Sequence, residues 1–362
     1  MRRARIGIIG AGFWAASFYL PFLAQQSDVE IIGVVRRNEE ALAGFRRAYD
    51  FEVVSSCIDD LLDARCDGVI VASPHSRHSE HAIAALEAGC HVLIEKPMTV
   101  SYRDAIAVRD AARLARRTLT LAYGWNYTRM MTWAEETVRS GALGRTTSVT
   151  GYMASSLTDL FAGRSGYGAI DVGGYVVEAQ PETWAQANQG GGYLYGQLSH
   201  LLGAALLLIP HAPLSVAARM NLLPNDSDLD VSLTVQFADD VIGTFSGHGR
   251  LPWGQRHSMD VRVAGEHGVI SVDMERERAE ILLSDDTKSI GVIRRSLAPA
   301  PETGEGRYAL EGGTRRFVDV CLGRDVPEHS SADLGVRTVA IMEAAARSAR
   351  LDGFQVHVRD VL

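Results

Sequence analysis

Two short stretches of the sequence carry residue types that could bind a ligand and move protons. The first is Glu95-Lys96-Pro97, which places a carboxylate and an amine directly after the apolar run at 92–94. Lysine is rare in this chain, where arginine is common, and this favours a specific role for Lys96 over general surface charge. The apolar run predicts a buried strand, and open α/β sheets bind their ligands at the carboxyl ends of such strands.

The second stretch runs from Gly190 to His200 and contains a glycine triplet before a predicted apolar helix. On that helix Gly196 and His200 are four residues apart, so they share one face. Three glycines before a helix allow the backbone to approach another segment or a ligand closely. Two interpretations of His200 remain open: it is a proton-transferring residue, or it is a buried histidine with satisfied hydrogen bonds.

A further motif, Gly10-Ala11-Gly12-Phe13-Trp14-Ala15, predicts a dinucleotide-binding turn between a strand at 6–9 and a helix through residue 23. The first glycine allows the tight turn, and the second lets backbone N–H groups approach a pyrophosphate. The small third residue permits close packing of helix on strand. The N-terminus of the helix also favours the anionic phosphates.

The end of the second strand, predicted at 30–35, indicates which dinucleotide is bound. This type of fold usually has an acidic residue there, which binds the 2′-hydroxyl of NAD, whereas this chain has Arg36-Arg37-Asn38. Two guanidinium groups suit a 2′-phosphate, so NADP(H) is the preferred cofactor and NAD(H) is possible. The alternative is that one arginine stacks on the adenine, in which case either dinucleotide binds.

The strand predicted at 68–72 ends in a loop that we expect to pack near the bound cofactor. His75, His78 and His81 follow at three-residue spacing, but they match no zinc-enzyme motif, and no metal is expected. The predicted cofactor-binding residues are Gly10, Gly12, Phe13, Trp14, Arg36, Arg37, Ser73, Pro74, His78, Glu95 and Lys96.

The elements that must position these motifs form two predicted domains, at 1–123 and 124–362. Strands and helices alternate through the first, which predicts a Rossmann domain with a doubly wound parallel sheet of about six strands. The second is predicted to be an α+β domain with a large open, mainly antiparallel sheet, because its strands are joined by short turns. Its expected elements are a helix at 130–140, a strand at 146–152, a glycine-rich loop over the pocket at 163–174, a run of strands between 215 and 283, and a closing helix at 334–350.

The composition limits the classes of partner. With 362 residues, of which 46% are hydrophobic and 22% charged, the chain is long enough for about two globular domains. A net charge of −8 argues against nucleic acid or a membrane as the main partner.

Four cysteines without zinc-site spacing fit a reducing cytoplasm, and the glycine turn argues against a cleaved signal peptide. An open antiparallel sheet needs cover, so we expect a homodimer or homotetramer that packs sheet on sheet.

In combination, these motifs resemble those of the Gfo/Idh/MocA oxidoreductases, the glucose–fructose oxidoreductase and inositol dehydrogenase family. The resemblance rests on the Gly10 turn, Ser73-Pro74, Glu95-Lys96-Pro97 and the glycine triplet before His200. It implies a Rossmann domain followed by a domain with a large open sheet. It also implies an NAD(P)-dependent dehydrogenase or reductase that transfers hydride at a carbinol or keto carbon of a sugar, glycoside or polyol.

The resemblance assigns Lys96 to the substrate hydroxyl and His200 to proton transfer. Both roles suit alcohol oxidation, in which a base removes the hydroxyl proton and a cation stabilises the developing alkoxide. Many relatives have an aspartate one helical turn before the histidine, where this chain has Gly196. Three possibilities follow: Lys96 and His200 suffice, Tyr195 or Gln197 contributes, or the pocket has opened for a bulkier substrate such as a glycoside. We favour the opened pocket, with Lys96 and His200 sufficing.

Aromatic and amide side chains suit polyhydroxylated rings, which predicts a sugar-facing wall. Two other functions compete with a dehydrogenase. One is a catalytically silent dinucleotide-binding regulator, because the family fold also serves a galactose-pathway repressor; the other is a glycoside-processing enzyme that retains and recycles its cofactor. The predicted substrate contacts are Trp125, Asn126, Tyr127, Arg129, Tyr195 and Gln197.

Overall fold

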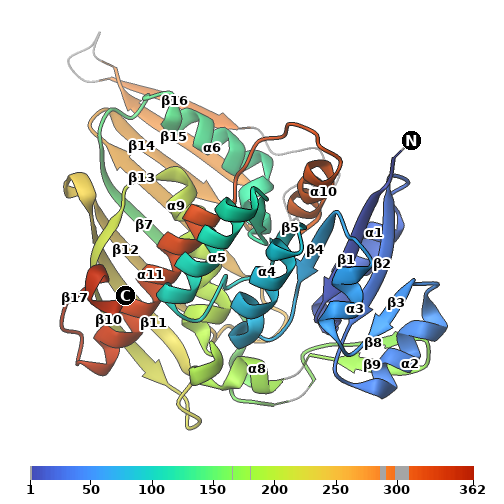
Figure 1. The fold of residues 1–362 in the computed structure, drawn as a ribbon. Helices are drawn as coiled ribbons and strands as arrows, with labels where there is room; N and C mark the ends of the chain where they lie inside the picture. The colour runs from blue at the N-terminus through green and yellow to red at the C-terminus, as the bar shows by residue number, and fades with distance from the viewer. Residues whose placement is uncertain (1, 165, 180, 286–290, 298–309) are drawn as a thin grey trace.

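The computed structural model describes residues 2–164, 166–179, 181–285, 291–297 and 310–362. Two sheets dominate this part of the chain, and Figure 1 shows helices packed between and around them. The N-terminal third, coloured blue to cyan, forms the smaller sheet. Within the described residues, no helix combines the length and the apolarity that crossing a lipid bilayer requires.

The smaller sheet is parallel throughout, and its described strands have the order β3-β2-β1-β4-β5-β6. Most of its strand residues are buried, as expected for a parallel sheet with helices on both faces. The strand order reverses at β1, and this is where such sheets open a crevice for a ligand. The predicted Rossmann sheet is therefore confirmed. Its strands are β1 (Ala4–Ile9), β2 (Val29–Val35), β3 (Val53–Ser55), β4 (Gly68–Val71), β5 (His91–Ile94) and β6 (Leu119–Leu121).

Two helices of this domain begin at side-chain caps that the sequence supplies. Asn38 Oδ1 accepts a hydrogen bond from the Ala41 N–H at the start of α2, and Ser101 Oγ accepts one from the Asp104 N–H at the start of α5. The helix predicted after the glycine turn begins as a π-helix, η1, and continues as α1. The helical segments are η1 (Ala15–Tyr19), α1 (Leu20–Ala24), α2 (Glu39–Ala48), α3 (Ile58–Asp63), η2 (His75–Arg77), α4 (His78–Glu87) and α5 (Tyr102–Ala115).

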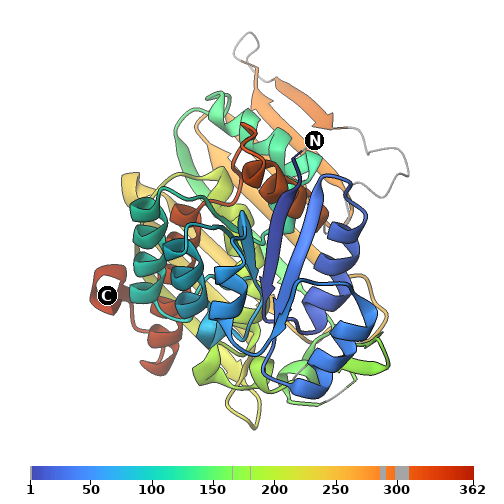
Figure 2. The same cartoon turned by 45° about the vertical axis from the view of Figure 1, so that its right-hand side comes forward.

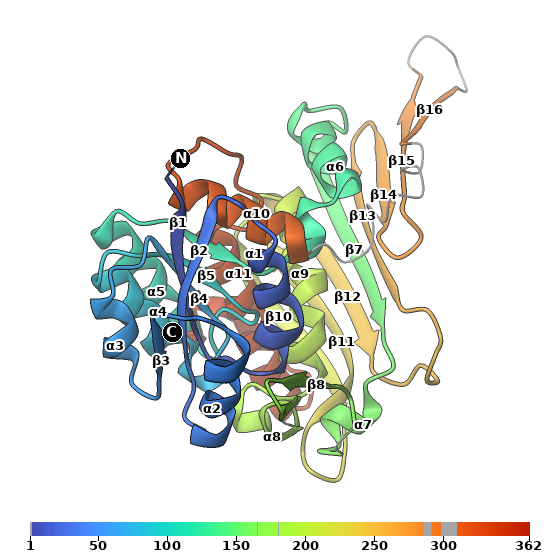
Figure 3. The same cartoon turned by 90° about the vertical axis from the view of Figure 1, so that its right-hand side faces the viewer.

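The larger sheet has nine described strands in the order β16-β15-β14-β13-β7-β12-β11-β10-β17. Neighbouring strands are antiparallel except β7 and β12, which run parallel. Buried and exposed side chains alternate along β11, so one face of the sheet packs on helices and the other is open (Figure 3). The strands are β7 (Thr146–Ala154), β10 (Pro213–Leu222), β11 (Asp228–Phe237), β12 (Ile242–His248), β13 (Ser258–Gly265), β14 (Gly268–Asp273), β15 (Arg278–Ser284), β16 (Val292–Leu297) and β17 (Val356–His357).

Two helices fill the space between the larger sheet and the first domain. Helix α9 is buried on all sides, which explains its continuous apolar sequence. Helix α11 packs against α9, α5 and β10. The helical segments of this half are η3 (Gly124–Tyr127), α6 (Arg129–Arg139), α7 (Thr158–Phe161), α8 (Pro181–Ala185), η4 (Ala187–Gln189), η5 (Leu194–Leu198), α9 (Ser199–Leu208), η6 (Ala238–Asp240), α10 (Leu310–Cys321), α11 (Ala332–Arg350) and η7 (Val358–Val361).

Besides α11, two segments beyond residue 123 return to the first domain, and the sequence predicts neither. Where a loop is expected at 163–174, the chain forms a hairpin of β8 (Ala169–Val172) and β9 (Tyr175–Glu178), while residue 165 lies outside the described residues. This green hairpin lies beside the blue helix α2 (Figure 2). Helix α10 packs on the smaller sheet through Phe317, against Gly68. The domain boundary after residue 123 remains a prediction.

Candidate active site

A cavity of about 560 Å³ lies along the carboxyl ends of β1, β2, β4 and β5. On one side it is lined by the glycine turn and by the loops that follow these strands, and on the other by β9, Ala179 and α8. Every residue predicted to bind the cofactor lines this cavity: Gly10, Gly12, Phe13, Trp14, Arg36, Arg37, Ser73, Pro74, His78, Glu95 and Lys96.

The glycine turn has the geometry that a bound pyrophosphate requires. Gly10 has φ of +91°, and a Cβ atom there would lie 2.3 Å from the backbone nitrogen of Ser73. Only glycine fits this position. At Gly12 the nearest atom to an added Cβ would be 3.9 Å away, so its backbone faces open space in the cavity. The turn therefore fits the phosphates of a dinucleotide.

The two arginines after β2 are not equivalent. Arg36 is half-buried, and its Nη1 donates a hydrogen bond of 2.6 Å to the carbonyl oxygen of Ala11 inside the glycine turn. Burial lowers the pKa of Arg36, and the nearby Tyr175 opposes this effect. Arg37 is exposed at the cavity. Arg36 thus supports the turn. Arg37 is the better placed of the two to bind a phosphate group of a ligand in the cavity.

The ring nitrogens of the three histidines after β4 contact backbone carbonyl oxygens and the Ser73 hydroxyl instead of converging on one point. The His78 ring nitrogens lie 2.8 Å from the carbonyl oxygens of Ser73 and Pro97, which joins this loop to the residue after Lys96. His75 Nδ1 lies 2.9 Å from the carbonyl oxygen of Gly190, while His81 Nδ1 lies 2.9 Å from the hydroxyl of Ser73. Within the described chain, no group of three or more His, Cys, Asp or Glu side chains could hold a metal ion.

Lys96 is buried at the end of β5, where it faces both the cavity and helix η5. Its Nζ donates a hydrogen bond of 2.9 Å to the carbonyl oxygen of Gly196 and lies 4.9 Å from the ring centroid of Trp184. Burial lowers the pKa of Lys96 to about 8, although Glu95 opposes the shift. This pKa allows Lys96 to be charged at neutral pH and to lose its proton under mildly basic conditions.

Glu95 holds the lysine backbone in place. One carboxylate oxygen accepts a hydrogen bond of 3.0 Å from the Lys96 N–H, and the other accepts one of 2.6 Å from the Tyr19 hydroxyl. Burial raises the pKa of Glu95, while Lys96 and Tyr19 lower it. Because Tyr19 belongs to the π-helix after the glycine turn, this carboxylate connects the predicted phosphate-binding turn to the lysine.

His200 lies on α9, behind the lysine, and is buried. Burial and the neighbouring Lys96 charge lower the pKa of His200 well below its usual value. Its ring packs edge-on against Tyr123, with centroids 6.2 Å apart. The imidazole is therefore neutral near pH 7 and is able to accept a proton. Among the described residues, His200 does not line the cavity, whereas Lys96 and Trp184 do.

The space beside Gly196 is filled, which corrects the expectation of an opened pocket. A Cβ atom at Gly196 would lie 2.8 Å from the ring of Phe161 on α7 and 3.4 Å from the ring of Trp184 on α8. These rings occupy the volume that an aspartate side chain would need. Lys96 Nζ instead donates a hydrogen bond to the Gly196 carbonyl oxygen, so the acceptor is a backbone carbonyl where the resemblance implies a carboxylate.

The glycine triplet makes room for a buried acid. Gly192 has φ of +91°, and an added Cβ would lie 2.1 Å from Oδ1 of Asp228. The other oxygen of Asp228 accepts a hydrogen bond of 2.7 Å from the Leu194 N–H at the start of η5. Burial raises the pKa of Asp228 to about 6. Asp228 therefore caps the helix that carries Gly196 and leads to His200.

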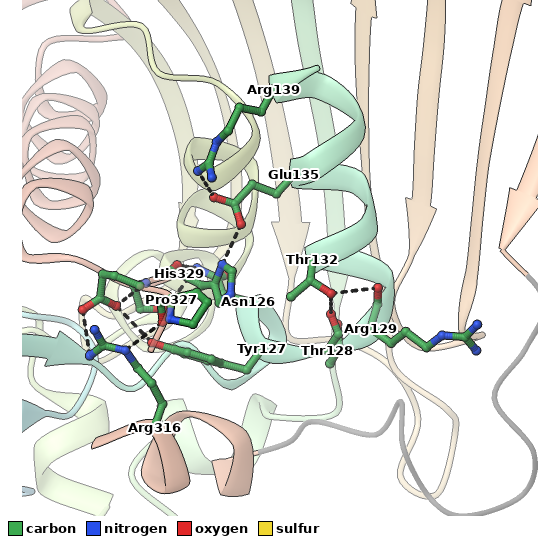
Figure 4. Close-up of polar contacts among 12 residues, drawn as sticks. Asn126, Tyr127, Thr128, Arg129, Thr132, Glu135, Arg139, Arg316, Pro327 and His329 are labelled. Carbon is green, nitrogen blue, oxygen red and sulfur yellow. Dashed lines mark hydrogen bonds and ion pairs between the residues drawn. The ribbon is translucent and has the colours of Figure 1, made fainter. Parts of the chain in front are cut away.

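Asn126 and Tyr127, two residues of the predicted sugar-facing wall, belong to a hydrogen-bond network away from the cavity lining (Figure 4). The Asn126 amide donates to the carbonyl oxygen of His329 at 2.8 Å, and the Tyr127 hydroxyl donates to Glu328 at 3.1 Å. Both side chains are occupied by the segment before α11. Trp125 is buried and does not line the cavity, and Arg129 points away from the network in Figure 4.

The two other predicted substrate contacts lie on η5, outside the cavity lining. Tyr195 is buried and its hydroxyl lies 3.4 Å from the Val100 carbonyl oxygen, whereas Gln197 is half-buried. The sequence does not reveal Tyr175, Glu178 or Trp184, which do line the cavity. No local motif marks these residues, because a hairpin and a short helix bring them there from distant parts of the chain.

The parallel sheet, the glycine turn and the cavity across its strand ends define a Rossmann-type protein built to bind a dinucleotide. Residues 4–123 match the family model described as oxidoreductase family, NAD-binding Rossmann fold. Residues 131–271 match the GFO/IDH/MocA C-terminal domain. The chain therefore belongs to the GFO/IDH/MocA oxidoreductases, which confirms the resemblance seen in its motifs.

Relatives with known activities match different shares of the chain. Glucose-6-phosphate 3-dehydrogenase of Bacillus subtilis is 37% identical over 123 residues, which is 34% of this chain and 34% of that protein. Levoglucosan dehydrogenase of Pseudarthrobacter phenanthrenivorans is 25% identical over 341 residues, covering 86% of this chain and 84% of that protein. The structure of a levoglucosan dehydrogenase in complex with NADH superposes on this chain with a TM-score of 0.77 and 21% sequence identity. The match covers 99% of this chain and 99% of that one. This likeness confirms the predicted fold class.

Proposed function

We propose that this protein is a dehydrogenase or reductase that transfers hydride between a nicotinamide and a carbinol or keto carbon of a sugar, glycoside or polyol. The observation that carries the proposal is the buried Lys96 ammonium in the cavity that the glycine turn lines, with a neutral His200 near it. Relatives that act on glucose 6-phosphate and levoglucosan support a carbohydrate-like substrate.

The nicotinamide, when bound, supplies the hydride donor or acceptor. The glycine turn would hold its phosphates, and Lys96 would bind the substrate oxygen. An ammonium has three N–H donors, one of which is engaged by Gly196, so Lys96 retains donors for the substrate. Its charge would stabilise the negative charge that develops on this oxygen during oxidation. His200, kept neutral by burial, lies outside the cavity lining, so the hydroxyl proton would reach it by way of Lys96, which would pass one proton to His200 and take one from the substrate.

A carbohydrate panel with both dinucleotides tests this function. Reduced-nicotinamide absorbance should change with at least one sugar, glycoside or polyol. Lys96→Ala and His200→Ala should each lower kcat by about 10²-fold or more, the range typical of lost acid–base groups. His267→Ala changes an exposed histidine outside the cavity and serves as the control. A wild type without activity on any substrate, or fully active Lys96→Ala and His200→Ala variants, would contradict the proposal.

The cofactor preference for NADP(H) rests on the two arginines after β2. Arg37 is exposed at the cavity, whereas Arg36 is held by the Ala11 carbonyl oxygen. Arg37→Asp should therefore lower the affinity for NADP by about tenfold or more and spare that for NAD, because an aspartate repels the 2′-phosphate. Arg36→Asp should weaken both cofactors, because it also removes the contact to the turn. An unchanged preference in Arg37→Asp would rule out this phosphate site.

A catalytically silent regulator remains the alternative, motivated by the missing aspartate at Gly196. The retention of Lys96 and His200 argues against it. Tight dinucleotide binding without turnover on any member of the panel would favour the regulator over the enzyme.

A further inference from the structure

The β8–β9 hairpin connects the second half of the chain to the dinucleotide-binding domain. Its backbone meets helix α2 at a pair of glycines: a Cβ atom at Gly44 would lie 2.5 Å from the Val172 carbonyl oxygen, and one at Gly173 would lie 2.3 Å from the Gly44 carbonyl oxygen. Glycine is a poor residue for a helix interior, so its presence in α2 is explained by this close approach. Figure 3 shows the hairpin beside α2.

The hairpin is also held by a hydrogen bond and by apolar burial. Arg47 Nε, on α2, donates a hydrogen bond of 2.6 Å to the Gly173 carbonyl oxygen. Val172 and Val177 are buried in the same apolar cluster as Phe45 of α2. The hairpin is thus docked on the first domain by backbone fit, side-chain burial and one guanidinium.

The docked hairpin forms part of the wall that faces the dinucleotide-binding residues. Tyr175 and Glu178 line the same cavity as Arg36 and Arg37. Just before the hairpin, Gly168 packs against the Phe13 ring of the glycine turn, since an added Cβ would lie 2.5 Å from that ring. Contacts from the second half of the chain therefore reach both the phosphate turn and the β2 end of the cavity.

We infer that the β8–β9 hairpin is a clasp that retains the dinucleotide, so that release of the cofactor requires the hairpin to leave α2. The inference rests on the proposed function, because it takes a dinucleotide as the ligand of the cavity. A ligand enclosed between the strand ends and the hairpin dissociates slowly, because the docking contacts must break first. In this proposal Gly44, Gly173 and Arg47 help to retain the cofactor and take no part in the reaction.

The test compares dinucleotide dissociation from the full-length wild type and from hairpin variants. NADPH or NADH fluorescence is followed in stopped flow after mixing the loaded protein with excess oxidised dinucleotide. Gly44→Leu forces the two backbones apart and should raise the dissociation rate by about tenfold or more, because interface changes act mainly on dissociation. Arg47→Ala removes one contact and should raise it by a smaller factor. Nicotinamide content after dialysis gives a second readout.

Arg46→Ala is the matched control. Arg46 is also an exposed arginine in the last turn of α2, but it donates to the Val54 carbonyl oxygen and not to the hairpin. It should leave the dissociation rate unchanged. Thermal melts show whether each variant is folded. If Gly44→Leu does not fold, the surface variant Arg47→Ala still tests the hairpin contact.

The outcomes separate the clasp from the proposed function. Equal dissociation rates for the wild type and the folded hairpin variants would overturn the clasp alone, because a dinucleotide would still bind. An equal acceleration in Arg46→Ala would also overturn it, since general loosening of α2 would then be the cause. A wild type that binds neither dinucleotide would overturn both proposals.

Discussion

Lys96 is stabilised as a cation by its partners and destabilised by its burial. The Gly196 carbonyl oxygen lies 2.9 Å from Nζ, and the Trp184 ring centroid lies 4.9 Å away; both interactions favour the charge. Burial is the larger effect, and it brings the pKa to about 8 in spite of Glu95. An exposed lysine titrates near pH 10, so this lysine changes its charge within the range in which enzymes are assayed.

The pH dependence of oxidation should report this titration. If protonated Lys96 stabilises the alkoxide, kcat/KM for alcohol oxidation falls above about pH 8, where the ammonium loses its proton. His200, with its pKa well below 6.5, should stay neutral and able to accept a proton through neutral pH. Lys96→Arg should move the alkaline limb upward, because a guanidinium keeps its proton. A rate that instead rises through pH 8 would identify Lys96 as the general base.

Filling the Gly196 position should disturb the packing around the lysine. In Gly196→Ala the new methyl would lie 2.8 Å from the Phe161 ring, so the free energy of unfolding should fall by about 1–3 kcal/mol, as in other overpacked cores. Phe161→Leu creates room, and the double variant should recover part of this loss. Denaturant unfolding of the two single variants and the double variant measures the coupling. Strictly additive effects would show that the ring does not occupy the position.

At the scale of elements, short strands such as β4 and β5 are predicted because they are nearly continuous buried apolar runs that alternate with helical patterns. The β8–β9 hairpin escapes such reasoning, since its strands mix polar and apolar residues, are mostly not buried, and follow a glycine-rich segment. The sequence also predicts Lys96 and His200, since strand ends and glycine triplets are local features. The roles of Phe161 and Trp184 depend on how α7 and α8 pack against η5, which no local pattern encodes.

The cap on η5 offers a test of how this element is held. Asp228→Ala should lower the free energy of unfolding by about 1–3 kcal/mol, because the buried Leu194 N–H loses its acceptor. Asp228→Asn retains an acceptor and removes the charge. Folding raises the pKa of Asp228 from 3.8 to about 6, so the folded protein binds this proton more tightly than the unfolded chain does. Protonation of Asp228 therefore stabilises the fold fully below pH 3.8, and this stabilisation is lost as the pH rises through 6.

Denaturant unfolding of the wild type and Asp228→Asn at several pH values measures this effect. Relative to the asparagine variant, the wild type should lose stability between about pH 4 and pH 6. Parallel stability curves for the two proteins across this range would show that the carboxyl group is not perturbed.

At the scale of the whole molecule, the larger sheet is covered on one face and open on the other (Figure 3). Thr234 of β11 pairs across the strands with Thr244 of β12, and both are exposed on the open face. Nearby Ile242 is 54% exposed. The same face also carries charge, because Arg262 pairs with Thr150 beside Thr244 and Arg219 pairs with Ser232. A second sheet would cover the uncharged side chains around Thr234 and would have to pair these arginines at its edges.

The predicted homodimer or homotetramer can be tested at this face. In a symmetric dimer, Thr234→Arg would place two copies of the new charge in one interface, so the oligomer should dissociate. Light scattering coupled to size exclusion measures the mass of the wild type and of the variant. Leu114→Arg, at a residue 86% exposed on α5, adds the same charge elsewhere and should leave the mass unchanged. A monomeric wild type, or an assembly that tolerates Thr234→Arg, would show that the open face is not an interface between copies.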